Sequence, residues 1–557
     1  MILVFFVWLL VFFVFFILGF SLVTAINGIA GKKWEKINLK PDEAFFIGFM
    51  ALSTISGLLS IWTPLSTKIL FFIVLLTVLL FLINFRQIKN NFSESVRTIS
   101  LLSGWEMLIL LFIIIFILTY TANKITLGDT ESYHAQSIQW VQKYAVVPGL
   151  GNIHGRLAFN SMFMVISGLF AFQIKDILIF PLNGICYIVL IIKLLFLYKK
   201  ENTPGNRWKA VFYMLTLLIS LLIMIPDLNS PSADIICATL IIYSFTILMN
   251  LGEKGSQLNY FQIILLNLVV LCCITFKISS LFLILLLLFL LKKDVVKKIW
   301  ISVAIGILVF SSFLIRNYYL SGYLIYPFPG IDLFNVDWKI PYDDVLSMKL
   351  EIESWAKIST LPASDVINMK ITQWIIPWFT SLNFNNKMIV TANILSVISI
   401  IIMFFKKDFF LVRIQLIILV NLIFWFLRAP DPRFAYGFLF LGFSLNFAYM
   451  LKHFDQPTSS GIFKFVKIGL ACFLFLIVCR RIIFPLNTLK NTSLWILPAP
   501  FGTVETNEHY SGFNYRVPVP EGGCFNVEIP CTPYPLTDIV LRGKDLQEGF
   551  KIVKQNP

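Results

Sequence analysis

Residues 2–26 read ILVFFVWLLVFFVFFILGFSLVTAI and contain no charged side chain. A run of about 20 apolar residues is long enough for one α-helix to cross the hydrocarbon core of a bilayer. Two later uncharged blocks, residues 261–276 and 279–291, have the same character. They do not alternate apolar and polar residues as membrane β-strands do, and only helices or closed barrels satisfy backbone polar groups in a bilayer. The sequence therefore predicts an all-α, polytopic transmembrane helical bundle.

The composition of the whole chain agrees with this prediction. Of its 557 residues, 58% are hydrophobic and 13% are charged, whereas soluble domains average about 25% charged residues. The net charge of +15 does not indicate nucleic-acid binding, because most Lys and Arg residues lie in short loops between apolar runs, where membrane topology explains them. We expect the lipid bilayer, and no nucleic acid, as a partner.

The apolar blocks predict about 14 membrane spans of roughly 20 residues each. The first block is expected to remain as an anchor, because it exceeds the roughly 7–15 apolar residues of a signal peptide and no basic segment precedes it. The spans are expected near residues 2–27, 44–63, 66–85, 105–121, 178–198, 210–226, 233–250, 260–276, 278–291, 299–315, 387–405, 410–427, 434–451 and 464–479.

The basic loops give the orientation of the bundle, since loops rich in Lys and Arg face the cytoplasm. These loops are residues 32–40, 86–97, 199–209, 292–298, 406–413 and 452–467. All of them agree with one orientation if the apolar stretch 157–172 does not cross the membrane, and a re-entrant or juxtamembrane helix is expected there. The outer segments are then the N-terminus and residues 121–156, 226–232, 316–387, 428–433 and 480–557.

The chain accordingly divides into three parts. These are N-terminal transmembrane helices (1–121), a transmembrane core (122–479) with outer loops 122–156 and 316–387, and a small outer C-terminal region (480–557). The last part is rich in Pro, Gly and Asn and carries Cys524 and Cys531. Two cysteines so close together in an outer loop favour a disulfide in an oxidising compartment, and two unpaired thiols are the alternative.

The first large outer loop concentrates groups that can do chemistry. Residues 127–134 read LGDTESYH, and they place Asp129, Glu131 and His134 directly after a span. In a helix starting near Asp129 and running to about residue 144, Glu131 and His134 would share a face. A carboxylate at the membrane surface is a candidate general base. The alternative is structural, since Asp commonly caps a helix N-terminus and Glu131 would favour the same end of the helix dipole.

Several polar and charged side chains elsewhere converge on the same side of the membrane. They are His154, Arg156, Asn160, Asp234, Lys277, Arg316, Arg428 and Arg433. Charges within or at the ends of spans are candidate functional residues, and the guanidinium fork suits phosphate oxygens. These residues are therefore candidates for substrate binding. Structural ion pairs, such as Arg433 with Asp431, and contacts with lipid headgroups are the alternatives, and Asp234 could simply cap its span.

The long outer loop 316–387 also carries four tryptophans. They are Trp338, Trp355, Trp374 and Trp378. Indole rings in this loop could stack on sugar rings. They could instead form an interfacial aromatic belt, and this second interpretation is favoured for Trp374 and Trp378.

Taken together, these features resemble the glycosyltransferase C (GT-C) superfamily, which includes protein O-mannosyltransferases, aminoarabinose transferases and oligosaccharyltransferases. The resemblance rests on Asp129 in the first large outer loop, Asp234 at the outer start of a middle span, and Arg433 near a late outer loop. The acidic motif here follows the fourth expected span, whereas it usually follows the first in that superfamily. Residues 129–136 (DTESYHAQ), 146–161 (VVPGLGNIHGRLAFNS) and 321–328 (SGYLIYPF) also look like a poorly characterised family of large bacterial membrane proteins.

The superfamily resemblance implies a GT-C-like fold and an inverting transfer of a sugar from a polyprenyl-phosphate donor to a lipid-linked glycan or another acceptor. It implies that Asp129 acts as base, and that Lys277, Arg316, Arg428 or Arg433 stabilises the leaving phosphate. No cofactor is required, although Asp129 and Glu131 are oxygen ligands that suit a divalent metal. The expected location is a bacterial inner membrane, with the site facing the periplasm. A flippase or transporter of lipid-linked saccharides and an O-antigen-type polymerase or ligase are the alternatives.

Overall fold

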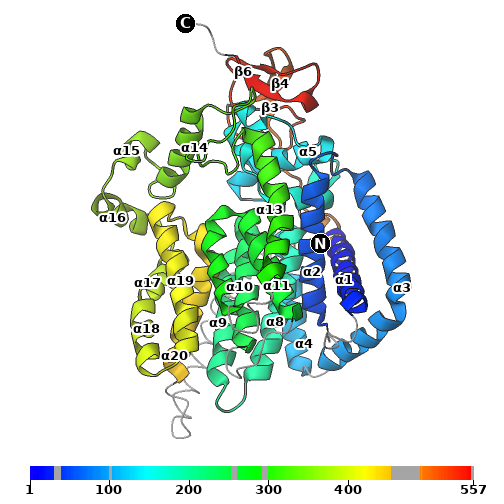
Figure 1. The fold of residues 1–557 in the computed structure, drawn as a ribbon, viewed down its shortest axis with the longest axis vertical. Helices are drawn as coiled ribbons and strands as arrows, with labels where there is room; N and C mark the ends of the chain where they lie inside the picture. The colour runs from blue at the N-terminus through cyan, green and yellow to red at the C-terminus, as the bar shows by residue number, and fades with distance from the viewer. Residues whose placement is uncertain are drawn as a thin grey trace.

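The computed structural model describes residues 1–30, 39–99, 103–251, 260–290, 299–452 and 492–553, together with residue 490. In this part of the chain, 11 helices are long and apolar enough to cross a membrane. They form a bundle whose axes run along the length of the molecule (Figure 1). The fold is therefore that of a polytopic helical membrane protein, as the apolar blocks predicted.

The long helices follow the expected spans closely. They are α1 (Ile2–Ala30), α2 (Pro41–Leu59), α3 (Thr67–Ile99), α4 (Gly104–Thr121), α8 (Leu182–Glu201), α9 (Arg207–Met224), α10 (Ala233–Leu251), α13 (Ile299–Ser321), the pair α17 (Phe384–Ile394) and α18 (Ser396–Phe405), α19 (Phe409–Arg428) and α20 (Tyr436–Lys452). Two further expected spans are the shorter apolar helices α11 (Tyr260–Phe276) and η5 (Ile278–Leu290). The expected span 464–479 and the basic loop 292–298 lie outside the described residues.

Short helices and strands make up the remainder of the described chain. The helices are η2 (Thr130–His134), α5 (Ala135–Lys143), α6 (Leu150–Ile153), η3 (Gly155–Ala158), α7 (Met162–Phe170), η4 (Ile225–Asp227), α14 (Tyr342–Trp355), α15 (Ala363–Ile367), α16 (Ile371–Ser381), η6 (Pro432–Ala435), α22 (Ser493–Ile496) and η8 (Leu546–Glu548). Three antiparallel pairs of strands join β1 (Phe172–Ile174) to β2 (Ile177–Ile179), β3 (Glu505–Tyr510) to β4 (Asn514–Val519), and β5 (Ile539–Leu541) to β6 (Phe550–Ile552).

Helix α7 is too short to cross a membrane, and the expected orientation requires that residues 157–172 do not cross. Its nine residues rise about 14 Å, less than half of a hydrocarbon core of about 30 Å. The end of α7 is tied back to α5, because the Gln142 side-chain amide donates hydrogen bonds to the carbonyls of Gly168 (2.9 Å) and Ala171 (3.2 Å). The stretch 157–172 therefore does not cross as a helix, and the orientation itself stays a prediction.

At one end of the bundle, the C-terminal segment and the outer loops form a single layer (Figure 1). We call residues 125–161, 322–383 and 492–553 the outer layer. Its core combines side chains from all three segments, including Trp140, Tyr323 and Phe550. The Phe550 N–H donates to the Pro148 carbonyl at 2.9 Å. The C-terminal segment is therefore packed into the outer loops rather than standing apart from them.

Gly149 shows how closely the C-terminal segment approaches the first outer loop. Its φ is +65°, and a Cβ atom there would lie 2.2 Å from the Phe550 carbonyl oxygen. Only glycine adopts this conformation without a steric cost and leaves room for the neighbouring backbone. Within the same segment, the Sγ atoms of Cys524 and Cys531 form a disulfide.

Candidate functional site

The carboxylate of Asp129 lies between two arginines. Asp129 immediately precedes η2, but its side chain makes no capping hydrogen bond. Its Oδ1 lies 3.7 Å from Nη1 of Arg156, and its Oδ2 lies 3.3 Å from Nη1 of Arg433. A role as helix cap therefore does not account for the position of this side chain, which instead joins the first outer loop to the start of α20.

Arg433 is shared between two carboxylates. In addition to its contact with Asp129, Arg433 contacts Asp431: its Nε lies 3.3 Å from Oδ2, and its backbone N–H donates to Oδ1 at 2.9 Å. Asp431 thus caps η6 and holds the guanidinium at the same time. Burial raises the pKa of Asp431, although the neighbouring Arg433 acts in the opposite direction. The ion pair between Arg433 and Asp431, expected as the structural alternative, is therefore present. It uses Nε of the guanidinium, whereas Nη1 faces Asp129.

A second ion pair, between Lys277 and Asp234, lies beside Arg433. Asp234 is in the first turn of α10, and Lys277 joins α11 to η5. The Lys277 Nζ also lies 3.6 Å from the ring centroid of Phe434, the residue that follows Arg433. The structure therefore brings together Asp129, Asp234 and Arg433, the three residues that carried the superfamily resemblance.

Helix α14 contributes acidic and aromatic partners to the same arginines. Glu351 accepts a 2.9 Å hydrogen bond from Arg156, and Trp355 lies with its ring centroid 5.4 Å from the Arg433 guanidinium carbon. Burial acts to lower the pKa of Arg156, but the hydrogen bond to Glu351 and the charge of Asp129 outweigh it, so the pKa is raised. We call Asp129, Arg156, Asp234, Lys277, Glu351, Asp431 and Arg433 the outer charge cluster.

The two expected catalytic partners of Asp129 face different neighbours. The chain from Thr130 to His134 is a π-helix, whose i→i+5 hydrogen bonds replace the expected α-helical turn in which Glu131 and His134 share a face. The Glu131 carbonyl accepts a hydrogen bond from the Phe525 N–H at 2.8 Å. A Cβ atom on Gly502 would lie 3.7 Å from the Glu131 carboxylate. Glu131 thus faces the C-terminal segment.

His134 and His154 are both neutral at physiological pH. His134 is 3% exposed, and its Nδ1 has no hydrogen-bond partner among the described residues. Burial lowers its pKa to about 4, although the nearby Asp129 and Asp234 act to raise it. Burial, with the charge of Arg156, also lowers the pKa of His154 to about 4. Neither imidazole therefore carries a positive charge in the folded protein at neutral pH.

A cavity of about 470 Å³ opens beside Arg433, a volume within the usual range for ligand sites. Its walls are Ile223, Pro226, Asp227, Trp355, Ala356, Lys357, Ser359, Trp378, Ser381, Leu382, Asn383, Asn385, Asn386, Asp431, Pro432, Arg433 and Tyr436. Amide, hydroxyl and indole groups thus surround the space next to the outer charge cluster. Trp378 is buried, and its indole N–H donates to the Pro430 carbonyl at 2.8 Å. Trp374 is also buried, so neither ring projects outward as a residue of an aromatic belt would.

Three of the other expected binding residues lie away from this cluster. Arg316 donates from Nε to Oδ1 of Asn160 at 3.1 Å and from Nη1 to the Ser60 hydroxyl at 2.8 Å. Arg428 is largely exposed and pairs with Glu353 at 3.8 Å. Among the described residues, Arg316, Asn160 and Arg428 therefore make no ion pair or hydrogen bond with the outer charge cluster.

The described residues contain no group of three His, Cys, Asp or Glu side chains arranged to hold a metal ion. Asp129 and Glu131, the oxygen ligands considered for a divalent metal, face the arginines and the C-terminal segment respectively. A metal at this site stays a prediction.

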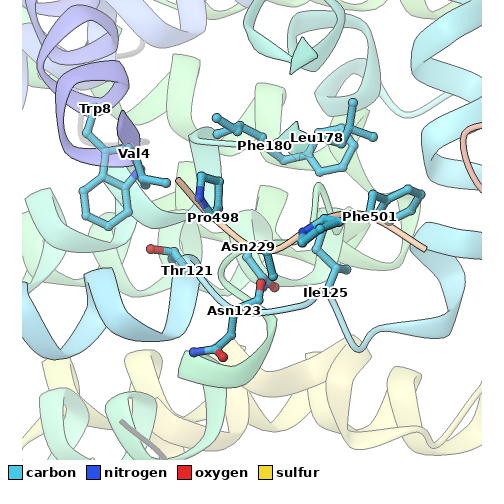
Figure 2. Close-up of a pocket in the computed structure, with 13 residues that line it drawn as sticks. Val4, Trp8, Thr121, Asn123, Ile125, Leu178, Phe180, Asn229, Pro498 and Phe501 are labelled. Carbon is cyan, nitrogen blue, oxygen red and sulfur yellow. The ribbon is translucent and has the colours of Figure 1, made fainter. Parts of the chain in front are cut away.

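A second, much smaller cavity lies where the C-terminal segment crosses α1. Figure 2 shows Pro498 on the side of Val4 and Trp8 of α1 and Phe501 on the opposite side near Ile125, with Asn229 between them. Its volume of about 20 Å³ is close to that needed by a single water molecule. This cavity is therefore a packing feature of the layer above α1, and the larger cavity at Arg433 is the candidate for substrate.

Comparison with known proteins gives one match. A family model described as a domain of unknown function (DUF8201) matches residues 1–440, a range that contains the whole outer charge cluster. No curated protein and no solved structure matches the chain.

Proposed function

Since the chain belongs to the DUF8201 family, whose description names no activity, we propose a function from the site itself. The protein is a membrane glycosyltransferase that moves a sugar from a polyprenyl-phosphate donor to a lipid-linked glycan or another acceptor. It acts at the outer face of a bacterial inner membrane. The observation that carries this proposal is the Asp129 carboxylate, which lies between Arg156 and Arg433 beside a polar cavity of about 470 Å³.

The cations of the outer charge cluster suit the phosphate of such a donor. Arg433 and Lys277 lie at the outer ends of α20 and α11, where the phosphate of a membrane-embedded lipid would reach them. An arginine fork binds phosphate oxygens through two hydrogen bonds. The Asp129 and Asp431 carboxylate oxygens lie 3.3 Å from the Arg433 nitrogens. Phosphate oxygens could replace these carboxylate oxygens as partners of the guanidinium.

The cavity supports binding of the sugar. Trp355 offers an aromatic ring on which the apolar face of a pyranose can stack. The side chains of Asn383, Asn385 and Asn386 provide both donors and acceptors, which match the hydroxyls of a sugar. Because Arg433 and Asp431 also line this cavity, a sugar bound there has its anomeric carbon within reach of the outer charge cluster.

The proposed step is a single displacement. The acceptor hydroxyl oxygen bonds to the anomeric carbon, and the bond from that carbon to the phosphate oxygen breaks with its electron pair on polyprenyl phosphate. The hydroxyl proton moves to Asp129, which acts as general base. Neutralised Asp129 no longer holds Arg156 and Arg433, so both guanidinium groups can stabilise the charge that develops on the phosphate.

The test is the substitution Asp129→Asn, assayed in liposomes with radiolabelled polyprenyl-phosphate hexoses and a bacterial lipid extract as acceptor source. We expect transfer to fall by about 100-fold or more, with little change in thermal stability, because the Asp129 side chain caps no helix. Asp337→Asn is the matched control, since Asp337 pairs with Arg542 at 2.9 Å away from the outer charge cluster.

Full transfer by Asp129→Asn would contradict the proposal. Movement of the labelled lipid between leaflets without a new glycosidic bond would favour the flippase alternative instead.

A further inference from the structure

Helix α16 packs against the bundle through one side only. Its tryptophans Trp374 and Trp378 are buried, and their ring centroids lie 5.4 Å and 5.5 Å from that of Phe426, near the outer end of α19. Figure 1 shows α16 beside this end of α19. Three other large apolar side chains of α16 are exposed, and we call them its apolar face: Ile371 (46%), Ile376 (68%) and Phe379 (36%). Adjacent exposed apolar side chains of this kind mark an interaction surface.

The exposed side chains of α16 are sorted by polarity around the helix axis. At about 100° per residue, Phe379 lies between Ile371 and Ile376, whereas Gln373 and Thr380 lie about 100–120° away from Phe379. The helix therefore has a buried aromatic side, an exposed apolar face and a polar edge. An apolar face beside a polar one is typical of helices that lie in the plane of a membrane surface.

The span that follows α16 fixes the depth of this helix. The 22 residues Phe384–Phe405 form one apolar membrane-crossing segment, which rises about 33 Å and so matches a hydrocarbon core of about 30 Å. Phe384, which is 72% exposed, therefore lies at the outer boundary of that core. Only two residues separate it from Ser381, the last residue of α16, so the end of α16 lies within about 11 Å of this boundary.

Lys387 indicates the same level independently. It lies in the first turn of α17, and its Nζ donates a 2.8 Å hydrogen bond to the Thr380 carbonyl in the last turn of α16. Lysines near the ends of spans extend the ammonium group toward the membrane surface. The end of α16 therefore lies where the charge of a span reaches water and lipid headgroups.

We propose that α16 is an interfacial helix, and that its apolar face inserts among the acyl chains of the leaflet nearest the outer layer. The bilayer is the occupant because this face continues through Phe384 onto the exposed side of α17 and α18, where Ile394 and Ile398 are 69% and 56% exposed. That surface belongs to a membrane span, so the lipid that covers it extends to α16.

The insertion places α16 between the leaflet and the large cavity. Trp378 and the residues at the end of the helix, Ser381 and Leu382, line that cavity. The bilayer therefore holds one wall of the cavity in place from its outer side. This inference is independent of the proposed sugar transfer, because it rests only on the exposure of α16 and on its depth.

The experiment measures the depth of a fluorescent probe on the full-length protein in liposomes. An environment-sensitive dye is attached to Phe379→Cys. It is quenched either by iodide on both sides of the membrane or by lipids that carry a nitroxide near the headgroup or near the end of the acyl chain. We expect the shallow nitroxide to quench this probe most strongly, because an interfacial helix buries its apolar face about 5–10 Å deep. Wild-type protein gives the background, since the free cysteines among the described residues are buried.

Three further probes serve as controls. Gln373→Cys is the matched control on the polar edge of the same helix, and iodide should quench it several-fold more strongly than the Phe379 probe. Tyr510→Cys in β3, at a position 75% exposed, is the aqueous reference. Ile394→Cys lies about 15 Å along the span from Phe384, near the middle of the bilayer, and the deep nitroxide should quench it most strongly.

The inference fails if iodide quenches the Phe379 probe as strongly as the Tyr510 probe, or if the deep nitroxide quenches it as strongly as the Ile394 probe. Equal behaviour of the Phe379 and Gln373 probes would also overturn it. So would protection of the Phe379 probe from every quencher, which would show that a protein partner, such as a second copy of the chain, covers this face.

Discussion

Two groups of paired charges, most of them partly buried, occupy opposite ends of the bundle, and they are built differently. The inner one joins α2, α8 and α10, and we call Asp42, Glu43, Lys193 and Tyr243 the inner charge cluster. Lys193 lies 2.6 Å from Oδ2 of Asp42, and the Tyr243 hydroxyl donates to the same oxygen at 3.0 Å. In the outer charge cluster, Asp129 lies 3.3 Å and 3.7 Å from its two arginines.

The difference separates structural pairing from pairing that can be exchanged. A short pair with an additional hydrogen bond to the same oxygen leaves little freedom to either partner, and it suits a role in holding helices together. The Asp129 carboxylate is shared between two arginines beside a cavity of about 470 Å³. If one arginine turns to a ligand in the cavity, the carboxylate still has the other arginine as its counter-ion. The two clusters are therefore not distinguished by burial. They are distinguished by the number of counter-ions available to each carboxylate and by the presence of a cavity beside it.

The largest expected effect that tests this comparison is on Arg433. Arg433→Gln should lower sugar transfer by about 100-fold or more, the usual scale for removing a donor that stabilises developing charge. Arg433→Lys should recover little, because lysine cannot reproduce the planar fork. Arg428→Gln is the control, since Arg428 is 56% exposed and makes a 3.8 Å pair, and such pairs contribute about 0–1 kcal/mol to stability. Equal losses in the two Gln variants would remove the distinction between them.

The inner charge cluster should show the opposite behaviour. Lys193→Met leaves the largely covered Asp42 carboxylate, whose side chain is 16% exposed, without its cation, and we expect stability to fall by about 3–5 kcal/mol. Transfer per folded molecule should stay near the wild-type value. The double variant Asp42→Asn/Lys193→Met should recover most of the stability, because the carboxylate that Lys193 neutralised is removed with it and Glu43 still has Lys40 at 3.9 Å. Chemical denaturation and the liposome assay measure the two quantities separately. A stable but inactive Lys193→Met protein would overturn the structural assignment.

A smaller effect is expected on the pH dependence of stability, through His134 beside the outer charge cluster. Because the pKa of His134 is lowered to about 4 from about 6.5 in the unfolded chain, the unfolded state binds more protons between these values. The stability that neutral His134 preserves is therefore complete above pH 6.5 and is lost as the pH falls toward 4, by about 2–3 kcal/mol at pH 4.5.

Melting temperatures measured from pH 7 to pH 4.5 test this effect. His134→Gln should flatten the slope in part, because His154 contributes in the same direction. Trp338→Phe should keep the wild-type slope, since it alters no group that titrates between these pH values. An unchanged slope in His134→Gln would show that His134 is not the group responsible.

The spans could be predicted from the sequence because long apolar runs are a local signal. Asp129, Asp234 and Arg433 could also be selected as candidates, since charges within or at the ends of spans are candidate functional residues. Their pairing was not, because Asp129 and Arg433 are 304 residues apart and no local pattern connects them. For the same reason Glu351, 195 residues from Arg156, had no signal beyond an acidic residue in an outer loop.

Three further features had no sequence signal of their own. A π-helix has no residue pattern that separates it from an α-helix, so the turn at residues 130–134 was expected to be α-helical. The absence of a direct contact between Arg316 and the outer charge cluster, among the described residues, could not be predicted either, because topology places all outer arginines on one side without assigning their neighbours. The asparagines that line the large cavity lack any distinctive spacing, and only the folded chain brings them beside Arg433.

The contact between Phe550 and the first outer loop constrains the order in which the protein is made. The Asn152 side chain donates a hydrogen bond to the Phe550 carbonyl, and the two residues are 398 positions apart. At about 5–20 residues per second, a ribosome needs roughly 20–80 s to cover that distance. During this time the helices enter the membrane while the loop that carries Asp129 lacks its cover. The face that carries Asp129 is therefore completed last, only after the C-terminal segment has been made and has packed against the first outer loop.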